Sequence, residues 1–509
     1  MAAIRSRQSR EKKGPNLIAI FVGLSILLSI IFAFSSIKLL ENDKLIAQDA
    51  PLKEFKQEQL LSPDIAIAIT DTDTDTDTIP TDEDDNPIPI SKSSTTSTTE
   101  QEPMEPNYHL IFSTDCSGYQ HWQSYLLFYN AYKVKQPGTV TRIASGCSQE
   151  EEIKEQEFQN KIAQHMSTDF KIHFTPVFSS VKDGTGKVTG NYSFFNKPFG
   201  VLHWMENAEG IHQDDVIILM DPDQVLTRPI TNDFTNREEN LLVGDDPKTT
   251  VTHGTPFGQM YGLADQWRHF DIDTITGTKD SPAKEVDQTD GMKHYPVGPP
   301  YLATAKDMHQ IALKWSEFAP GVHADYYNLL AEMYAYCIAA AHLKLPHQVV
   351  TSLMVSDTGG GSGGWGFEGW ELIHRIDDDK VCNPSVLDGA VLPSVLHFCQ
   401  QYMVGKYFFG KREVPHNIFT CESPLLEYPP EDIATKYDYF IPPPPHKPVG
   451  EKKELNKGQA KMNAFMICAL TRAVNEAAVF YQEHNCDVGK KAGEALDLWD
   501  KKLIKQYPN

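Results

Sequence analysis

The sequence predicts an α/β fold with a mostly parallel central sheet, and three observations carry this prediction. Residues 216–220 are all apolar, which is typical of a strand buried on both faces. Strand-like and helix-like stretches alternate before this run, as a sheet with crossover helices requires. Two carboxylates, Asp221 and Asp223, follow the run at the edge where such sheets bind ligands.

The N-terminal part of the chain predicts a membrane anchor. Residues 17–37 are uncharged and apolar, and at ~1.5 Å per residue they are long enough to cross the roughly 30 Å hydrocarbon core of a bilayer. Basic residues precede this stretch and acidic residues follow it, so we expect residues 1–16 to be a cytosolic tail. The expected topology is therefore a single-pass type II signal anchor, and a cleaved signal peptide is the alternative.

Residues 38–106 are acidic and contain a Thr-Asp repeat, so we expect a disordered stem on the lumenal side. The net charge of −23 argues against a nucleic-acid partner. Eight cysteines fit an oxidising lumen with some disulfides, whose pairing the sequence does not give. The sequence contains no Cys-x-x-Cys pair, so it does not suggest a zinc site. The sequon at Asn191 predicts N-glycosylation.

Hydrophobic periodicity predicts the elements ahead of the acidic motif. Strands are expected at 108–115, 140–143 and 170–178, and helices at 122–132, 150–165 and from about 199 to Gly210. Thr114 and Asp115, at the end of the first strand, are candidate nucleoside contacts, although Asp115 could equally cap a turn. Lys197, at a helix start, could place a cation beside a diphosphate, or could simply face solvent.

The acidic motif itself predicts a metal site. Asp221 and Asp223, together with a phosphate, would form a hard oxygen site suited to Mn²⁺ or Mg²⁺. Asp-x-Asp patterns are common by chance, and the Thr-Asp repeat contains several. Only the pair after residues 216–220 follows an expected strand.

Five segments resemble one family in the same order. Residues Asp221-Pro222-Asp223-Gln224-Val225-Leu226 with Arg228-Pro229-Ile230 are similar to the central motif of plant and algal hydroxyproline O-arabinosyltransferases and peptidyl-serine α-galactosyltransferases. The other four segments are Asn196-Lys197-Pro198, Gly298-Pro299-Pro300-Tyr301, Glu332-Met333-Tyr334-Ala335-Tyr336 and Leu396-His397-Phe398. The resemblance extends from about residue 108 to 428.

The resemblance implies a GT-A-like glycosyltransferase with a mixed, mostly parallel central sheet. It also implies a location in the Golgi or ER membrane, with the catalytic domain in the lumen. It implies a nucleotide-sugar donor such as a UDP-sugar, and hydroxyproline or serine of a secreted protein or peptide as acceptor. Asp221 and Asp223 would bind the divalent cation and the diphosphate, and Asn196 and Lys197 would contact the donor. His397 would be a third metal ligand, with a structural histidine as the alternative.

Glu332 is the candidate general base if the enzyme inverts the anomeric centre. It could instead cap its helix or form a salt bridge there, and a retaining enzyme would need no such base. The Gly-rich residues 359–364 could be a mobile lid or a surface insertion.

The expected domains are a catalytic domain at 107–430 and, at 431–509, a Pro-rich linker with a C-terminal helical segment. Two other functions stay open: transfer to polysaccharide or lipid, and an inactive membrane-anchored sugar-binding scaffold.

Overall fold

The structure is a computed structural model that describes residues 106–182, 185–359, 368–436, 440–441, 453–487 and 495–506. The expected cytosolic tail, the signal anchor and nearly all of the stem lie outside these residues. So do most of the glycine-rich segment and the proline run 442–445.

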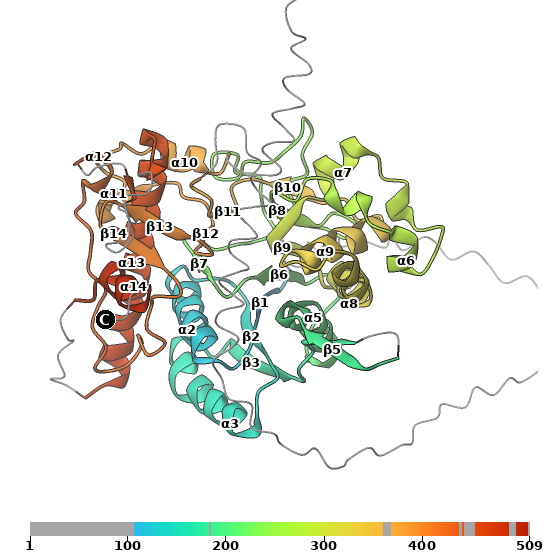
Figure 1. The fold of residues 1–509 in the computed structure, drawn as a ribbon, viewed down its shortest axis with the longest axis horizontal. Helices are drawn as coiled ribbons and strands as arrows, with labels where there is room; N and C mark the ends of the chain where they lie inside the picture. Colours follow the sequence, from blue (N-terminus) through green and yellow to red (C-terminus); the bar gives the residue numbers. More distant parts are fainter. Residues whose placement is uncertain are drawn as a thin grey trace, which may run out of the picture. The chain divides into compact units, whose positions relative to one another are not determined.

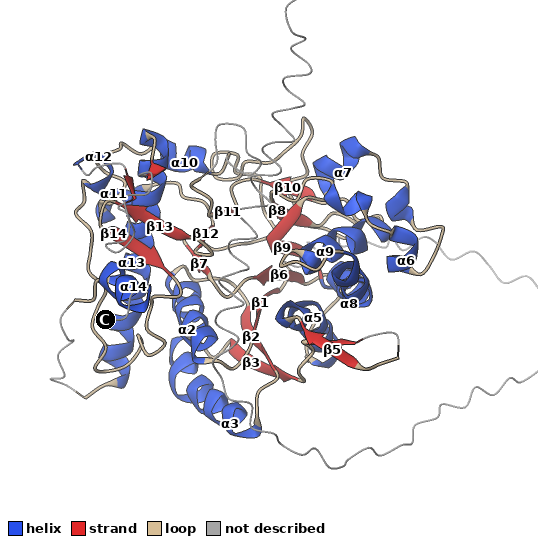
Figure 2. Cartoon of the chain, viewed as in Figure 1, coloured by secondary structure: helices blue, strands red, loops and turns tan. Residues whose placement is uncertain are grey.

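A seven-stranded sheet forms the centre of the molecule (Figures 1 and 2). Its order is β10-β8-β9-β6-β1-β2-β3, and β9 runs antiparallel to both of its neighbours while every other pair is parallel. The predicted mixed, mostly parallel sheet is therefore confirmed. The strands are β1 (Tyr108–Thr114), β2 (Thr139–Ser145), β3 (Phe170–Thr175), β6 (Val216–Met220), β8 (Phe257–Met260), β9 (Val297–Thr304) and β10 (Gln348–Val350).

Strand β6 is buried on both faces, as its apolar run predicts. Ile218 and Met220 belong to one hydrophobic core, which they share with residues of α2 (Gly118–Lys133) and α13 (Lys457–Asn485). Ile217 and Leu219 belong to the other, with residues of α5 (Asn196–Asn207), α8 (Ala305–Asp325) and α9 (Ala331–His342). Helices thus cover both faces of the sheet, and α5, α8 and α9 lie together on one of them (Figure 1).

Strand β9 was not recognisable from the sequence because it contains Pro299 and Pro300, and proline is rare in central strands. The pairing of β8 with β9 shifts register between Gly258 and Gln259, and the two prolines lie opposite this irregularity. The sheet tolerates the missing N–H donors there because the ladder is already interrupted. Strand β3 likewise ends three residues before its predicted limit, just ahead of Pro176.

A second, three-stranded sheet has the order β11-β12-β7 and lies beside the carboxyl end of β6. It consists of β7 (Gln224–Leu226), β11 (Met354–Val355) and β12 (Val395–His397). The remaining strands are β4 (Ser180–Lys182), β5 (Val188–Asn191), β13 (Gln401–Val404), β14 (Tyr407–Gly410), β15 (Phe440–Ile441) and β16 (Lys453–Glu454). The other α-helices are α3 (Gln149–Phe158), α4 (Gln164–Met166), α6 (Ile272–Thr276), α7 (Gln288–His294), α10 (Trp370–His374), α11 (Pro384–Gly389), α12 (Ile433–Lys436) and α14 (Leu498–Gln506).

Helix α13 lies within residues 431–509, where the sequence predicts a helical segment. Within the described part of the chain, it is the helix long and apolar enough to cross a membrane, but 67% of its apolar window is buried inside the molecule. A buried core helix meets the same criterion, and its apolar side chains Phe465, Met466 and Leu470 are in fact fully buried in the larger core.

Three disulfides join segments that are distant in sequence: Cys116–Cys147, Cys382–Cys468 and Cys421–Cys486. Cys337 is a buried free thiol and Cys399 an exposed one. The expectation of some disulfides is confirmed. The bond from Cys382 to Cys468 attaches α13 to the segment before α11.

Candidate active site

The Asp221-Pro222-Asp223 turn connects β6 to β7, at the carboxyl end of the central strand. The backbone N–H of Asp221 donates to Gln224 Oε1 at 3.0 Å, and Gln224 Nε2 donates to the Pro299 carbonyl at 3.1 Å. Gln224 is fully buried, so it holds the turn against β9. Gln224 therefore supports the turn that carries the two carboxylates.

His397 reaches the same turn from β12. Strands β12 and β7 are antiparallel, and His397 pairs with Gln224. Its Nε2 lies 3.2 Å from Asp223 Oδ1, and its own carbonyl accepts a 2.8 Å hydrogen bond from the Tyr402 hydroxyl. The next residue, Phe398, donates its N–H to the Asp223 carbonyl at 3.0 Å. The predicted grouping of His397 with the acidic motif is therefore present.

Ligand atoms of Asp221, Asp223 and His397 all lie within 4.8 Å of one another. Two carboxylates and one imidazole suit a divalent first-row ion such as Mn²⁺, and the carboxylates also suit Mg²⁺. Asp223 and His397 are buried and Asp221 is partly buried. The donor set therefore fits the divalent cation that the sequence predicts.

Two lysines flank the acidic motif, one beside each carboxylate. Lys197 Nζ is 2.8 Å from Asp221 Oδ1, and Lys411 Nζ is 2.5 Å from Asp223 Oδ2. Burial opposes both charges, but Asp221 and Glu332 hold the pKa of Lys197 above its usual value, and Asp223 does the same for Lys411. Burial would also raise the pKa of Asp223, yet Lys411 and His397 keep it well below its usual range. Both lysines are thus positioned as cations.

Glu332 lies in the first turn of α9 and is almost completely buried. Its Oε1 accepts from Lys197 Nζ at 2.8 Å, while Oε2 has no hydrogen-bond partner among the described residues. Burial raises the pKa of Glu332, and the nearby Lys197 opposes that shift. The ion pair that the sequence left open does form, although the lysine belongs to α5 rather than to the same helix.

The residues at the end of β1 are fixed by protein contacts. The Thr114 hydroxyl donates to the Ile143 carbonyl at 3.4 Å and accepts from Arg142 Nε at 2.9 Å. Asp115 is exposed, and its Oδ1 accepts from both the N–H and the hydroxyl of Ser117. The capping role considered for Asp115 is therefore present. Since β1 pairs with β6, both residues lie at the same sheet edge as Asp221.

Asn196 contacts both strand β1 and the segment after β3. Its side-chain oxygen accepts from the Phe178 N–H at 2.8 Å, and its carbonyl accepts from the Ser113 hydroxyl at 3.5 Å. It therefore fixes the start of α5, from which Lys197 projects. Asn191, the sequon residue, is exposed at the end of β5, and its carboxamide is accessible to modification.

Sequence reasoning missed Lys411, Tyr261 and Arg142. The Tyr261 hydroxyl lies 3.3 Å from His397 Nδ1, the ring nitrogen that does not face Asp223. Arg142 is buried and donates to Glu155 Oε2 at 2.6 Å and to the Asp115 carbonyl at 2.9 Å, so it anchors the end of β1. No motif marked these side chains. The one available signal was the position of Arg142, a charged residue inside a strand that the sequence predicts.

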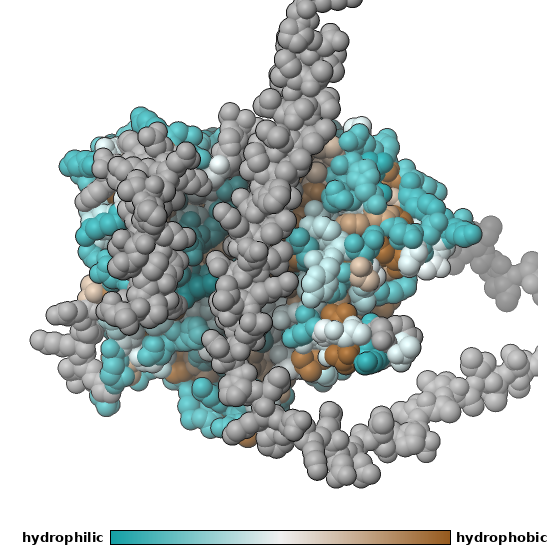
Figure 3. Space-filling view, in the orientation of Figure 1, coloured by the Kyte–Doolittle hydropathy of each residue, from teal (hydrophilic) through white to brown (hydrophobic). Residues whose placement is uncertain are grey.

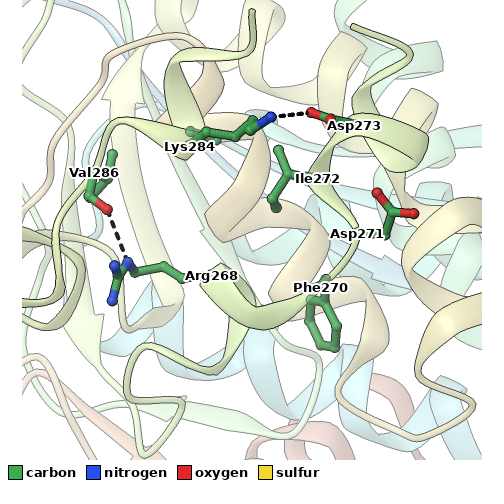
Figure 4. A pocket seen from close by; sticks show the side chains of 8 residues that line it. Arg268, Phe270, Asp271, Ile272, Asp273, Lys284 and Val286 are labelled. Atoms are coloured by element: carbon green, nitrogen blue, oxygen red, sulfur yellow. Dashed lines mark hydrogen bonds and ion pairs between the residues drawn. The ribbon is translucent and has the colours of Figure 1, made fainter. Parts of the chain in front are cut away.

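A separate surface hollow of about 310 Å³ lies between α6 and the segment 282–286 (Figure 4). Arg268 donates to the Val286 carbonyl at 2.9 Å, and Lys284 pairs with Asp273 at 2.7 Å. None of the predicted site residues lines this hollow. It is distinct from the carboxylate site.

Comparisons with known proteins agree with the motifs. The family model "Hydroxyproline O-arabinosyltransferase family N-terminal domain" matches residues 108–243. A peptidyl serine alpha-galactosyltransferase of Arabidopsis thaliana is 25% identical over 257 residues, which cover 48% of this chain and 27% of that protein. The chain thus spans about a quarter of the length of this curated relative.

Among solved structures, the galactosyltransferase LgtC with donor and acceptor sugar analogs is 11% identical, with a TM-score of 0.31. A structure of an active-site mutant of LgtC gives 0.30, and each match covers 57% of this chain and 87% of the other. Such low TM-scores do not by themselves establish a common fold. The family match rests on the sequence: residues 108–243, which contain the acidic motif, are similar to the N-terminal domain of the hydroxyproline O-arabinosyltransferase family.

Proposed function

We propose that this protein is a metal-assisted, GT-A-like glycosyltransferase that moves a sugar from a nucleotide sugar to hydroxyproline or serine of a secreted protein. The observation that carries the proposal is the meeting of Asp221, Asp223 and His397 at the carboxyl edge of the sheet, within 4.8 Å of one another. The family match and the galactosyltransferase relative support the reaction class.

Asp221, Asp223 and His397 would hold the divalent cation, which supplies charge neutralisation to a departing nucleotide diphosphate. Lys197 and Lys411 add two ammonium groups beside the same carboxylates. Their positive charge would bind diphosphate oxygens and lower the cost of the charge that builds on the leaving group. Tyr261, at the His397 ring, and Tyr402, at the His397 carbonyl, would keep this residue in place.

The acceptor hydroxyl needs a proton acceptor only if the enzyme inverts the anomeric centre. Glu332 stays our candidate for that role in an inverting reaction. Its ion pair with Lys197 supports a second role, in which Glu332 positions this lysine beside Asp221. The experiment below addresses the donor sugar and the acceptor residue.

We further propose a Golgi or ER location, with residues 17–37 as a signal anchor and the catalytic domain in the lumen. Three disulfides support an oxidising compartment. The exposed sequon at Asn191 supports it as well. Digestion of the full chain with an N-glycosidase tests this location, since a cytosolic catalytic domain would show no shift in mobility.

The decisive experiment offers the full chain a panel of nucleotide sugars with hydroxyproline and serine peptides, before and after chelation. We expect transfer to one peptide class, loss of activity on chelation, and recovery with Mn²⁺ or Mg²⁺. Transfer to glycan or lipid but never to peptide would reject the peptidyl function. Absence of donor turnover in the wild type would instead favour an inactive scaffold.

A further inference from the structure

An exposed aromatic surface lies next to the candidate site. The side chains of Tyr327, Leu329 and Phe194 are 77%, 50% and 41% exposed. Exposed apolar residues that gather in one place can mark an interaction site. Tyr327 and Leu329 lie in the connection between α8 and α9, and Phe194 lies between β5 and α5. We call these three residues the aromatic surface. Hydrophobic side chains are visible around β5 and α8 in Figure 3.

Tyr192 joins the three residues into one surface. Its ring lies 5.3 Å from the Phe194 ring and 4.2 Å from that of His323, which in turn is 4.7 Å from the Tyr327 ring. The Tyr192 hydroxyl donates to the Leu329 carbonyl at 2.8 Å. Tyr192 and His323 are themselves buried, so they support the exposed rings from below.

The aromatic surface is connected to the carboxylate site through a short series of polar contacts. The Tyr192 hydroxyl accepts the Glu332 N–H at 3.2 Å. Glu332 pairs with Lys197, and Lys197 pairs with Asp221, each at 2.8 Å. Tyr192, Glu332 and Lys197 therefore connect the aromatic surface to Asp221.

We infer that the aromatic surface binds an extended, proline-rich segment of the acceptor protein beside the residue that receives the sugar. This inference rests on the proposed function. Polyproline II segments have no internal hydrogen bonds and are recognised by uncharged aromatic surfaces onto which their rings pack. The side chains of Tyr327, Leu329 and Phe194 carry no charge, and their connection to Lys197 and Asp221 through Tyr192 and Glu332 would bring the acceptor hydroxyl to the donor.

The test measures binding of a fluorescent hydroxyproline–proline peptide to the full chain in detergent, by anisotropy, together with nucleotide-sugar hydrolysis without acceptor. We expect Tyr327→Ala and Phe194→Ala each to weaken peptide binding by about fivefold to thirtyfold, since a truncated aromatic anchor costs on the order of 1–2 kcal/mol. Tyr327→Phe should bind as the wild type, because stacking needs the ring and not the hydroxyl. Donor hydrolysis should stay unchanged in all three variants.

Tyr428→Ala is the matched control, because Tyr428 is 53% exposed and is not part of the aromatic surface. Unchanged peptide affinity in Tyr327→Ala, with active wild type, overturns the inference but leaves the proposed function standing. A wild type that neither binds peptide nor turns over donor overturns both. If the effect of Tyr327→Ala disappears once Asn191→Gln removes the glycan, the rings pack against the protein's own glycan and the inference is wrong.

Self-association is measured in the same samples by light scattering. A wild-type dimer that Tyr327→Ala converts to a monomer would show that the surface binds a second copy of the chain, which also overturns the inference. We expect the same molecular mass for both proteins.

Discussion

Lys411 Nζ lies 2.5 Å from Asp223 Oδ2, although 188 residues separate the two in the sequence. His397 approaches the other oxygen of the same carboxylate at 3.2 Å. Asp223 is therefore the point where the turn after β6, the end of β12 and the segment after β14 meet. A change in any of these three segments should therefore alter the contacts of the Asp223 carboxylate.

The first prediction concerns Lys411 as a diphosphate contact. Lys411→Met should weaken binding of uridine diphosphate by about tenfold or more, because a charge-assisted hydrogen bond contributes roughly 1.5–3 kcal/mol. Binding of uridine should be unaffected. Titration calorimetry of the two ligands measures the difference. Lys406→Met is the control, since Lys406 lies over the Tyr407 ring instead of at the carboxylates. Equal losses for both ligands would contradict the assignment.

The second prediction concerns the metal ligands. Asp223→Asn should lower donor turnover by about two orders of magnitude or more, because loss of one charged ligand weakens both the cation and the diphosphate sites. Turnover is measured as release of the nucleotide with and without added Mn²⁺. Full activity of the wild type after exhaustive chelation would show that Asp221, Asp223 and His397 serve another purpose.

The third prediction concerns the pairing of Glu332 with Lys197. Both side chains are largely buried, and breaking such a pair typically costs about 3–5 kcal/mol. We expect Glu332→Gln, which keeps the shape, to lower the free energy of unfolding by about 1–3 kcal/mol. The double variant with Lys197→Met should be less than additive, as contacting residues usually are. Chemical denaturation of the four proteins gives the coupling energy.

The same variant separates the two roles of Glu332. If Glu332 positions Lys197, Glu332→Gln raises the KM for the donor and leaves the acid limb of the kcat–pH profile in place. If it accepts the proton of the acceptor, kcat falls and the acid limb disappears, while the donor KM is unchanged.

The fourth prediction concerns Gly298 in the Gly-Pro-Pro-Tyr segment of β9. A Cβ at this position would meet the Tyr261 ring at 2.4 Å, and the Tyr261 hydroxyl contacts His397. Gly298→Ala should displace the ring, cost about 1–3 kcal/mol of stability, and weaken cation binding. Gly262→Ala is the matched control, since a Cβ there meets nothing within 4 Å. Equal behaviour of the two variants in Mn²⁺ titrations would contradict this role of Gly298.

The fifth prediction concerns His347, a fully buried side chain whose Nε2 lies 3.0 Å from the Tyr336 hydroxyl. Burial lowers the pKa of His347 from 6.5 to about 3. The unfolded chain therefore binds a proton below pH 6.5 that the folded chain does not bind until about pH 3. Its contribution to stability is complete above the unfolded pKa and is lost as pH falls between those values, by about 1.4 kcal/mol per unit.

Urea denaturation at several pH values between neutral and mildly acidic tests this expectation. His347→Gln should show a shallower pH dependence than the wild type, by the equivalent of one proton. His309→Gln, which changes an exposed histidine, should follow the wild type. A wild-type slope that matches that of His347→Gln would show that His347 does not titrate on unfolding.

Local sequence determined the parts of this protein whose signal is continuous along the chain. The apolar run Val216–Met220 fixes a buried strand because five successive side chains avoid water, and the carboxylates after it must stand at the edge of the sheet. The alternation of strands and helices from residue 108 follows from periodicity in the same way. His397 was found through its motif.

Only the tertiary structure decided which distant side chains complete the site. Lys411 carries no local mark that separates it from other lysines, and it becomes significant only because β14 ends beside Asp223. The prolines of β9 kept this central strand from being predicted. Local propensity contains no information about the irregular hydrogen-bond pairing between β9 and the neighbouring β8, which accommodates the prolines. Hydrophobic periodicity indicates which side chains of a segment face the core and which face solvent. The pairing of segments depends instead on packing between residues that are far apart in the chain.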